Sequence, residues 1–224
     1  MIAPRVALLA ALAMAFLAGC ANQRPGAYDY GAFQKAHPAT LLVLPPLNES
    51  PDVKGTPGVW SNATRPLAEA GYYVLPVTLV DATFKQNGIT EAADAQAVAW
   101  QKLHEVFGAD AAVYIKVKRY GTSYQVVASD TRVEASARVV DLRTGDLLWE
   151  GSAVASSAEN NSGGGGGIAG LLVRAIVDQI VKSATDASFT YAAIADARML
   201  GAPRYNGILP GPRSPQAGQV PAAP

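Results

Sequence analysis

Few side chains of this chain could take part in chemistry. The single cysteine, Cys20, ends an apolar run near the amino terminus. The two histidines, His37 and His104, are far apart, and neither lies near a nucleophile motif such as G-x-S-x-G. Asp141 and Asp146 could be taken for paired carboxylates, but the intervening sequence DLRTGD is typical of a hairpin turn. No set of His, Cys and carboxylates has the spacing of a metal site. We therefore expect no catalytic residue, no metal site and no enzyme activity.

Two polar or flexible stretches remain as candidate binding sites. Asn48, Glu49 and Ser50 follow the first predicted strand, where ligands often meet an α/β sheet. They are the candidate ligand-binding residues, and a loop that only shapes the domain is the alternative. The glycines at 163–167 precede a predicted helix, where an anion could bind, but the lysine and hydroxyl of a phosphate-binding loop are missing. We interpret this run as a hinge that lets the last helix move or swap onto another copy. No cofactor is expected.

The amino-terminal segment has the three parts of a secretory signal. Arg5 supplies positive charge, residues 6–17 are apolar, and small residues lead to Cys20. The apolar stretch is shorter than the roughly 20 residues that a membrane-spanning helix needs. The pattern predicts a signal peptide at 1–19, and a buried core helix is the alternative. Cys20 has no second cysteine with which to form a disulfide.

The four residues at 17–20, LAGC, resemble the lipobox of bacterial lipoproteins. The resemblance implies cleavage between Gly19 and Cys20, a diacylglycerol on the Cys20 thiol and a fatty acyl group such as palmitate on the new amino group. Ala21, in place of aspartate, implies the outer membrane, with the protein on its periplasmic face or on the cell surface. Several acyl chains give stable membrane attachment, whereas one holds only marginally.

Length and charge exclude some classes of protein. Removal of residues 1–19 leaves 224 − 19 = 205 residues, enough for one domain with a substantial core. Of 18 basic and 18 acidic residues, only Arg5 leaves with the signal, so the mature formal charge is 17 − 18 = −1. This balance argues against a nucleic-acid binder and gives no sign of a polybasic membrane-binding segment.

The chain divides into an anchor, one domain and a tail. Residues 20–38 are expected to form a lipidated, flexible tether that lets the domain stand off the membrane, residues 39–213 the domain, and residues 214–224 a disordered tail. Within the domain, apolar runs and alternation predict five strands, with a turn at 120–124 and a hairpin turn at 141–146. The predicted strands are 40–44, 72–76, 113–117, 132–139 and 147–155.

Four helices are predicted, and they complete an α/β domain. The first is expected to begin at Thr56-Pro57, to kink at Pro66 and to end at Gly71. The others are expected at 77–87, 91–107 and 168–200. The order of elements predicts a single domain with a mixed β-sheet of about five strands, packed by helices and closed by a long C-terminal helix.

Several longer stretches resemble a known group of envelope proteins. LLVLPPLNES at 41–50, GADAAVYIKV at 108–117 and VVDLRTGDLLWEG at 139–151 resemble the superfamily of the TolB N-terminal domain, CsgG and the LpoB-type lipoproteins. A closer resemblance is to a family of bacterial lipoproteins without an assigned activity, one member of which is a meningococcal surface antigen. Its marks are PLAEAGYYVLPVTLVDATFKQNG at 66–88, FGADAAVYIKVKRYGTSY at 107–124 and GILPGPRSP at 207–215.

The resemblance implies a TolB-N-like α/β fold and a non-catalytic binding role in an envelope transport or assembly complex. It implies envelope proteins as partners, with a CsgG-like lipoprotein as one candidate, and a homo-oligomer as another arrangement. The alternative is an envelope receptor or enzyme that uses Asn48, Glu49 and Ser50 for a small ligand.

Overall fold

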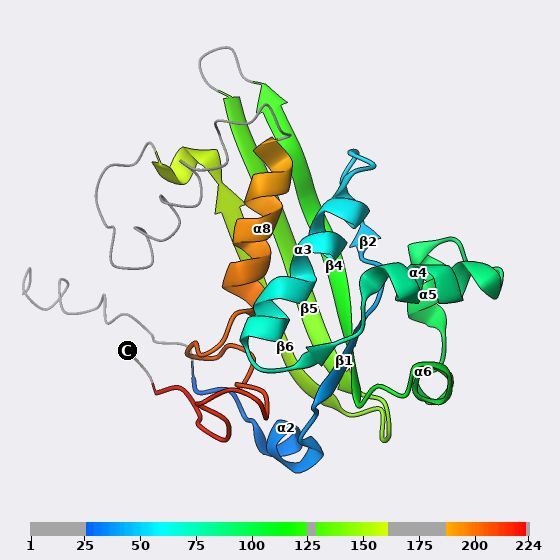
Figure 1. Ribbon diagram of the computed structural model, residues 1–224. Helices are drawn as coiled ribbons and strands as arrows, with labels where there is room; N and C mark the ends of the chain where they lie inside the picture. Colours follow the sequence, from blue (N-terminus) through cyan, green and yellow to red (C-terminus); the bar gives the residue numbers. More distant parts are fainter. Residues whose placement is uncertain (1–25, 125–128, 161–186, 223–224) are drawn as a thin grey trace, which may run out of the picture.

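The structure is a computed structural model that describes residues 26–124, 129–160 and 187–222 (Figure 1). One mixed sheet carries helices on both faces. No helix in the described part of the chain is long and apolar enough to cross a membrane. The elements are α2 (Gly31–Ala36), β1 (Thr40–Val43), β2 (Leu47–Asn48), α3 (Gly55–Glu69), β3 (Tyr73–Val74), α4 (Val77–Gln86), α5 (Ala92–Ala97), α6 (Trp100–Phe107), β4 (Ala111–Tyr124), β5 (Ser129–Asp141), β6 (Leu147–Ser156), a 3₁₀ helix η1 (Ser157–Asn160) and α8 (Ala187–Leu200).

The strands lie in the order β3-β1-β4-β5-β6, and β2 pairs with β4 beyond the end of β1. β1 is parallel to β3 and β4, whereas β4, β5 and β6 form an antiparallel meander. Leu41 and Leu42 are both fully buried, because β1 is covered by helices on both faces. The predicted α/β fold with a mixed sheet is confirmed, with β2 as a sixth strand that the sequence did not indicate.

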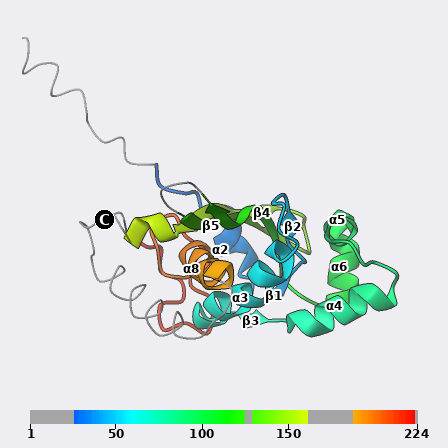
Figure 2. The ribbon, with the colours of Figure 1, turned by 90° about the horizontal axis from the view of Figure 1, so that it is seen from above.

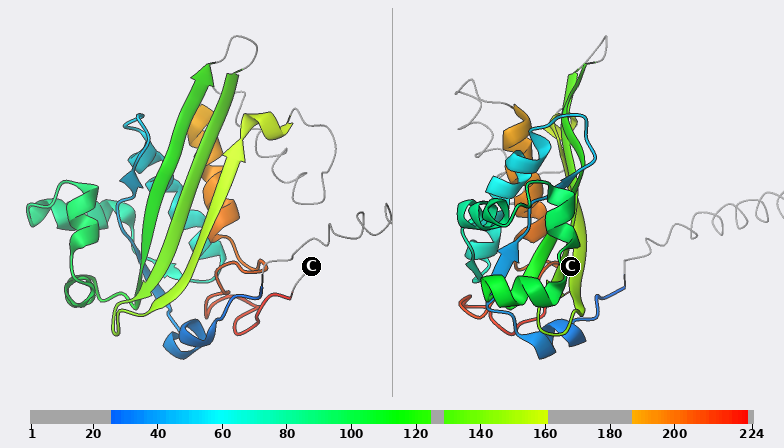
Figure 3. Two further views of the ribbon diagram at one scale, coloured as in Figure 1. Left: turned by 180° about the vertical axis from the view of Figure 1, so that it is seen from behind. Right: turned by 90° about the vertical axis from the view of Figure 1, so that its right-hand side faces the viewer.

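Two helical layers pack on the sheet. α3 and α8 pack against each other and cover one face, where Val59, Leu67 and Ile194 belong to the larger apolar core (Figure 2). On the opposite face α4, α5 and α6 pack against β1 and the start of β4. The rest of that face of β4, β5 and β6 carries exposed or half-buried polar side chains and has no described helix over it (Figure 3). We call it the open face.

The predicted turn at 120–124 is wrong. These residues continue β4, which pairs with β5 as far as Tyr124 and Ser129. The hydroxyls of Thr122 and Thr131 meet across the two strands at 2.8 Å. Because cross-strand contacts extend to this point, the connection between the strands falls at 125–128, outside the described residues.

The single helix predicted at 91–107 is also wrong, because α5 and α6 are separate. Val98 and Ala99 adopt extended geometry, with ψ angles of 131° and 137°. The Gln96 amide donates hydrogen bonds to the carbonyls of Pro45 and Ile115, at 2.8 and 3.0 Å. These tertiary contacts hold α5 against the strand ends while Leu103 on α6 packs into the smaller core.

The start of α3 also differs from the prediction. The helix begins at Gly55, and the Thr56 hydroxyl donates to the Pro46 carbonyl at 3.0 Å instead of capping the helix. Pro66 lies inside the helix, which continues to Glu69. Gly71 follows with a φ of +97°, as its predicted role in ending the helix requires, and a side chain there would collide with the backbone of Ser214.

The ends of the domain are more ordered than predicted. From Tyr28 the supposed tether is folded: Tyr30 and Phe33 are buried, and the Tyr30 hydroxyl donates to the Gly207 carbonyl at 2.5 Å. The tail forms successive turns, in which the Ala217 amide donates to the Ser214 carbonyl at 3.0 Å. The last helix ends at Leu200 as predicted. Its predicted start at 168 and the glycine run at 163–167 lie outside the described residues.

Candidate functional site

The polar side-chain atoms of Asn48 and Ser50, in the candidate ligand-binding loop, form hydrogen bonds within the loop itself. The Asn48 Oδ1 accepts hydrogen bonds from the Ser50 amide at 3.0 Å and from the Ser50 hydroxyl at 2.7 Å. The Asn48 Nδ2 donates to the Asp52 carbonyl at 2.7 Å. Asn48 also lies so close to Gly55 that a Cβ there would meet its Oδ1 at 2.5 Å. This geometry favours a loop that shapes the domain.

Glu49 is the member of this loop that reaches outward. Its amide donates to the Val117 carbonyl at 2.8 Å, and its carboxylate lies 3.0 Å from the Lys116 ammonium. Both side chains of this ion pair are about half exposed, at 53% and 46%. Such pairs contribute little to stability. Glu49 therefore connects the loop to the open face without closing a ligand cavity.

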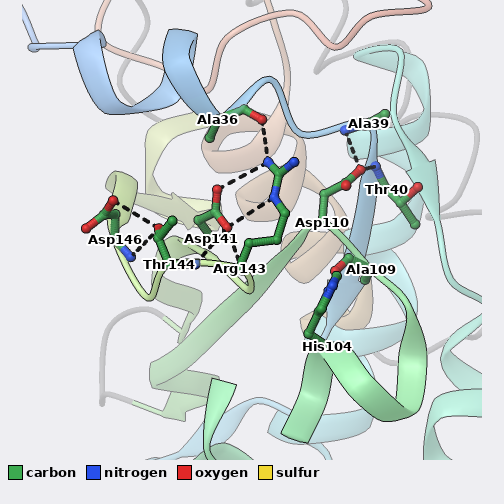
Figure 4. A network of polar contacts seen from close by, with 10 residues as sticks. All are labelled: Ala36, Ala39, Thr40, His104, Ala109, Asp110, Asp141, Arg143, Thr144 and Asp146. Carbon is green, nitrogen blue, oxygen red and sulfur yellow. Dashed lines mark hydrogen bonds and ion pairs between the residues drawn. The ribbon is translucent and has the colours of Figure 1, made fainter. Parts of the chain in front are cut away.

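The other candidate carboxylates, Asp141 and Asp146, accept hydrogen bonds within the hairpin turn at 141–146 (Figure 4). The buried Asp141 Oδ1 accepts from the amides of Arg143 and Thr144, at 2.6 and 3.2 Å. Asp146 accepts from the Thr144 hydroxyl at 2.9 Å, and the Asp141 amide donates to the Asp146 carbonyl at 2.9 Å, so both aspartates close the same turn. The Arg143 guanidinium also donates to the Ala36 carbonyl, at 2.5 Å. The turn interpretation is therefore supported, and the turn is tied to α2.

The two histidines have structural contacts as well. The His104 Nδ1 lies 2.9 Å from the Ala109 carbonyl, next to Asp110, whose carboxylate accepts from the amides of Ala39 and Thr40 (Figure 4). His37 ends α2 with a positive φ of 44°. Among the described residues no three His, Cys, Asp or Glu side chains are grouped so as to hold a metal ion.

A hollow of about 600 Å³ lies on the open face. Arg138 lies over the Tyr114 ring, with its Cζ 4.8 Å from the ring centroid, and burial raises the pKa of Tyr114. Lys118 and Arg138 form no ion pair with another described residue. The lining residues are Leu47, Gln96, Tyr114, Ile115, Lys116, Lys118, Ser136, Ala137, Arg138, Glu150, Gly151 and Ser152.

An apolar groove of about 390 Å³ lies at the β3 edge of the sheet. β3 is the last strand in the order and pairs with β1, with no second strand partner in the described chain. Tyr73 and Leu79 are 53% and 63% exposed there, which is unusual for such large apolar side chains. We call it the β3 groove; it is lined by Thr40, Tyr73, Leu75, Pro76, Leu79, Val80, Thr83, Phe107 and Gly108.

Known proteins resemble this chain over most of its length. The model of the family described as "Putative lipoprotein GNA1162-like" matches residues 28–213. The chain belongs to this family. It is 49% identical over 206 residues to the "Putative lipoprotein NMB1124/NMB1162" of Neisseria meningitidis serogroup B, covering 92% of this chain and 95% of the relative.

The solved structure of a family member agrees with this assignment. The crystal structure of lipoprotein GNA1162 from Neisseria meningitidis has 55% identity and a TM-score of 0.54, and it covers 65% of this chain and 100% of that one. The C-terminal domain of LpoB from Salmonella enterica has 16% identity and a TM-score of 0.39, over 53% of this chain and 82% of that one. The family match, the Neisseria relative and the GNA1162 structure together confirm the predicted family.

Sequence reasoning missed three features of this GNA1162-like chain. The basic side chains of the hollow were interpreted only as the wet positions of alternating strands. The β3 groove was not predicted, because nothing local distinguishes Tyr73 and Leu79 from core residues. The third is Asp196, a fully buried residue of α8 whose two carboxylate oxygens have no hydrogen-bond partner among the described residues. An acidic residue within an otherwise apolar helical stripe was the available signal.

Cys20, the predicted lipidation site, lies outside the described residues.

Proposed function

We propose that the protein is held in the outer membrane by lipid on Cys20 and acts there as a non-catalytic binding or assembly module of a cell-envelope complex. Membership of a lipoprotein family supports the anchor. The observation that carries the binding role is the β3 groove, where large apolar side chains lie exposed beside an open strand edge.

The domain lies close to its anchor. The Tyr28 amide donates to the Asn206 side chain at 2.9 Å, so the folded body begins 28 − 20 = 8 residues after Cys20. Eight extended residues span at most about 29 Å. The first folded residue therefore stays within about that distance of the lipidated Cys20, and the connection is shorter than the flexible tether expected over residues 20–38.

The β3 groove suits a protein partner. An open strand edge can accept the backbone of another chain, and exposed apolar side chains beside it add favourable burial. Tyr73 and Leu79 flank the groove from β3 and from α4, so a partner segment could contact both. The partner we propose is another envelope protein.

The second candidate function is a small-ligand receptor or enzyme at Asn48, Glu49 and Ser50. The internal hydrogen bonds of Asn48 and Ser50 weigh against it, because a ligand would have to displace them. Thermal-shift screening with nucleotides, sugars and cell-wall fragments tests this candidate. A reproducible rise in melting temperature that Asn48→Ala abolishes would favour it over the binding module.

Site-specific cross-linking in living cells tests the proposed function. A photo-reactive phenylalanine analogue at position 79 should give discrete adducts with an envelope protein. The same analogue at Arg65, which is exposed on α3, is the matched control and should give none. Equal cross-linking patterns at the two positions, or none at position 79, would contradict the docking role. Cys20→Ser tests the anchor separately, because it should release the protein from the membrane fraction.

A further inference from the structure

The hollow on the open face contains a row of basic side chains. Lys116 and Lys118 lie two residues apart on β4, and Arg138 lies on β5 opposite Tyr114. A strand advances about 3.3 Å per residue, so Arg138, opposite Tyr114, lies roughly 6.6 Å along the sheet from Lys116. Lys118 follows at the register irregularity between Val117 and Arg119. All three residues line the hollow, which places the row on the open face and away from α3 and α8.

The hollow is basic although the chain as a whole is neutral. Its lining has three basic residues against one acidic residue, Glu150, whereas the whole chain has 18 of each kind. Lys118 and Arg138 lack an ion-pair partner among described residues, and the exposed pair of Lys116 with Glu49 is weak enough to exchange. The hydroxyls of Ser136 and Ser152 line the same hollow as possible donors to phosphate oxygens.

The start of the folded chain lies beside this hollow. The Asn206 side chain holds Tyr28 and also donates to the Gly26 carbonyl, at 2.9 Å in each case. The Tyr28 hydroxyl faces the backbone of Glu150, which lines the hollow. In the right-hand view of Figure 3 the first described residues, in blue, lie on the side of the sheet opposite α3 and α8. Cys20 precedes Gly26 by 26 − 20 = 6 residues, a contour length of at most about 22 Å.

We infer that the open face lies against the bilayer, where Lys116, Lys118 and Arg138 bind the phosphates of anionic lipid headgroups. The inference rests on the proposed lipid anchor, because the short connection to Cys20 brings this face within reach of the membrane. The row spans about 13 Å, which a single phosphate ion cannot cover but several neighbouring headgroups can. Each basic group near an anionic surface adds to the attraction, and the attraction acts only within a Debye length.

The test uses the mature, lipidated protein reconstituted into vesicles. With Cys20 acylated, Ser152→Cys introduces one thiol in the hollow, and Ala68→Cys introduces one on the exposed surface of α3 as a control. Labelling by a membrane-impermeant maleimide is compared between phosphatidylcholine vesicles and vesicles that also contain phosphatidylglycerol. We expect labelling at position 152 to slow on the order of tenfold with phosphatidylglycerol, and labelling at position 68 to stay unchanged.

Variants that remove charge then test whether the basic side chains cause the slower labelling at position 152. Lys118→Gln with Arg138→Gln should restore labelling at position 152, whereas Arg65→Gln with Lys85→Gln, which removes the same charge from α3 and α4, should not. Sodium chloride at about 1 M should also restore labelling, because it shortens the Debye length to roughly 3 Å. If Ser152→Cys does not fold, Glu150→Cys in the same hollow replaces it.

The outcomes separate this inference from the anchor. Protein that floats with the vesicles but is labelled equally fast at position 152 in both compositions overturns the membrane-facing role and leaves the anchor intact. Protection that survives the Lys118 and Arg138 changes also overturns it. So does protection that appears only with inorganic phosphate, or only with an added acidic protein. Protein that fails to float with vesicles overturns the anchor and this inference together.

Discussion

Because of Asp196, the free energy of unfolding of the protein should fall as the pH rises. Its side chain is fully buried on α8, and in the described part of the chain neither oxygen has a hydrogen-bond partner. Burial raises the pKa of this carboxyl well above its ordinary value. An ionised carboxylate at this position would lose its hydration without compensation, so the folded protein keeps the proton.

The magnitude follows from proton linkage. Below the ordinary aspartate pKa of about 3.9 both the folded and the unfolded chain are protonated, and Asp196 makes no pH-dependent contribution. Above it the unfolded chain releases the proton while the folded chain retains it. The free energy of unfolding therefore falls by about 1.4 kcal/mol per pH unit until the raised folded-state pKa is passed.

Asp196→Asn isolates this contribution, because the amide resembles the neutral acid in shape and cannot ionise. We expect the variant to gain stability relative to the natural chain by about 1.4 kcal/mol for each pH unit within the window. Urea unfolding from pH 4.5 to 8 in half-unit steps measures the difference. Asp94→Asn, at an exposed position on α5, is the control and should leave the pH dependence unchanged. Parallel curves for the natural chain and Asp196→Asn would refute the reasoning.

Two further substitutions test the packing described above. Asn48→Ala should lower the free energy of unfolding by about 1–2 kcal/mol in urea titrations, because partners of the Asn48 side chain lose their hydrogen bonds; an unchanged midpoint would show that the loop does not depend on it. Gly58→Ala should cost roughly 1–3 kcal/mol, since its Cβ would lie 2.8 Å from ring carbons of Tyr120. Gly26→Ala meets nothing within 4 Å and is the control; equal melting temperatures for the two glycine variants would contradict the close packing of α3 on β4.

The local sequence pattern was sufficient to predict an element wherever one of its faces is buried and the other is exposed to solvent. In β5, Val133, Ala135 and Val139 are fully buried, as their alternation with polar residues predicted. Trp149, the largest side chain of the strand predicted at 147–155, is 2% exposed, and its indole N–H donates to the Asn206 carbonyl at 3.0 Å. The hairpin turn was predictable because Asp141 and Gly145 have conformational and hydrogen-bonding roles within a few residues.

Prediction failed where distant contacts override local preference. Residues 91–107 have a helical pattern, yet Val98 and Ala99 are extended, with the Gln96 amide bonded to the Pro45 and Ile115 carbonyls. The segment from Tyr28 looked like a linker because it is rich in Gly and polar residues. It is folded because Asn206, some 180 residues away, bonds its backbone. Neither contact leaves a signal within a short window of sequence.

The candidate sites depend most on tertiary structure. Lys118 and Arg138 are 20 positions apart and show no basic cluster in the sequence. They share one hollow because the antiparallel pairing of β4 with β5 brings positions distant in the sequence side by side on one face. In the sequence Tyr73 and Leu79 likewise cannot be told from core residues, and they are exposed because the strand order leaves β3 at the edge of the sheet.

The sequence by itself determined the membership of the chain in a lipoprotein family, the α/β class and most strands, because long motifs and hydrophobic periodicity are local properties. Only the tertiary structure decided where the folded body begins, which face of the sheet stays uncovered and which charges gather there. Those features depend on strand order and on contacts between residues far apart in the chain, and they exist only once the sheet has assembled.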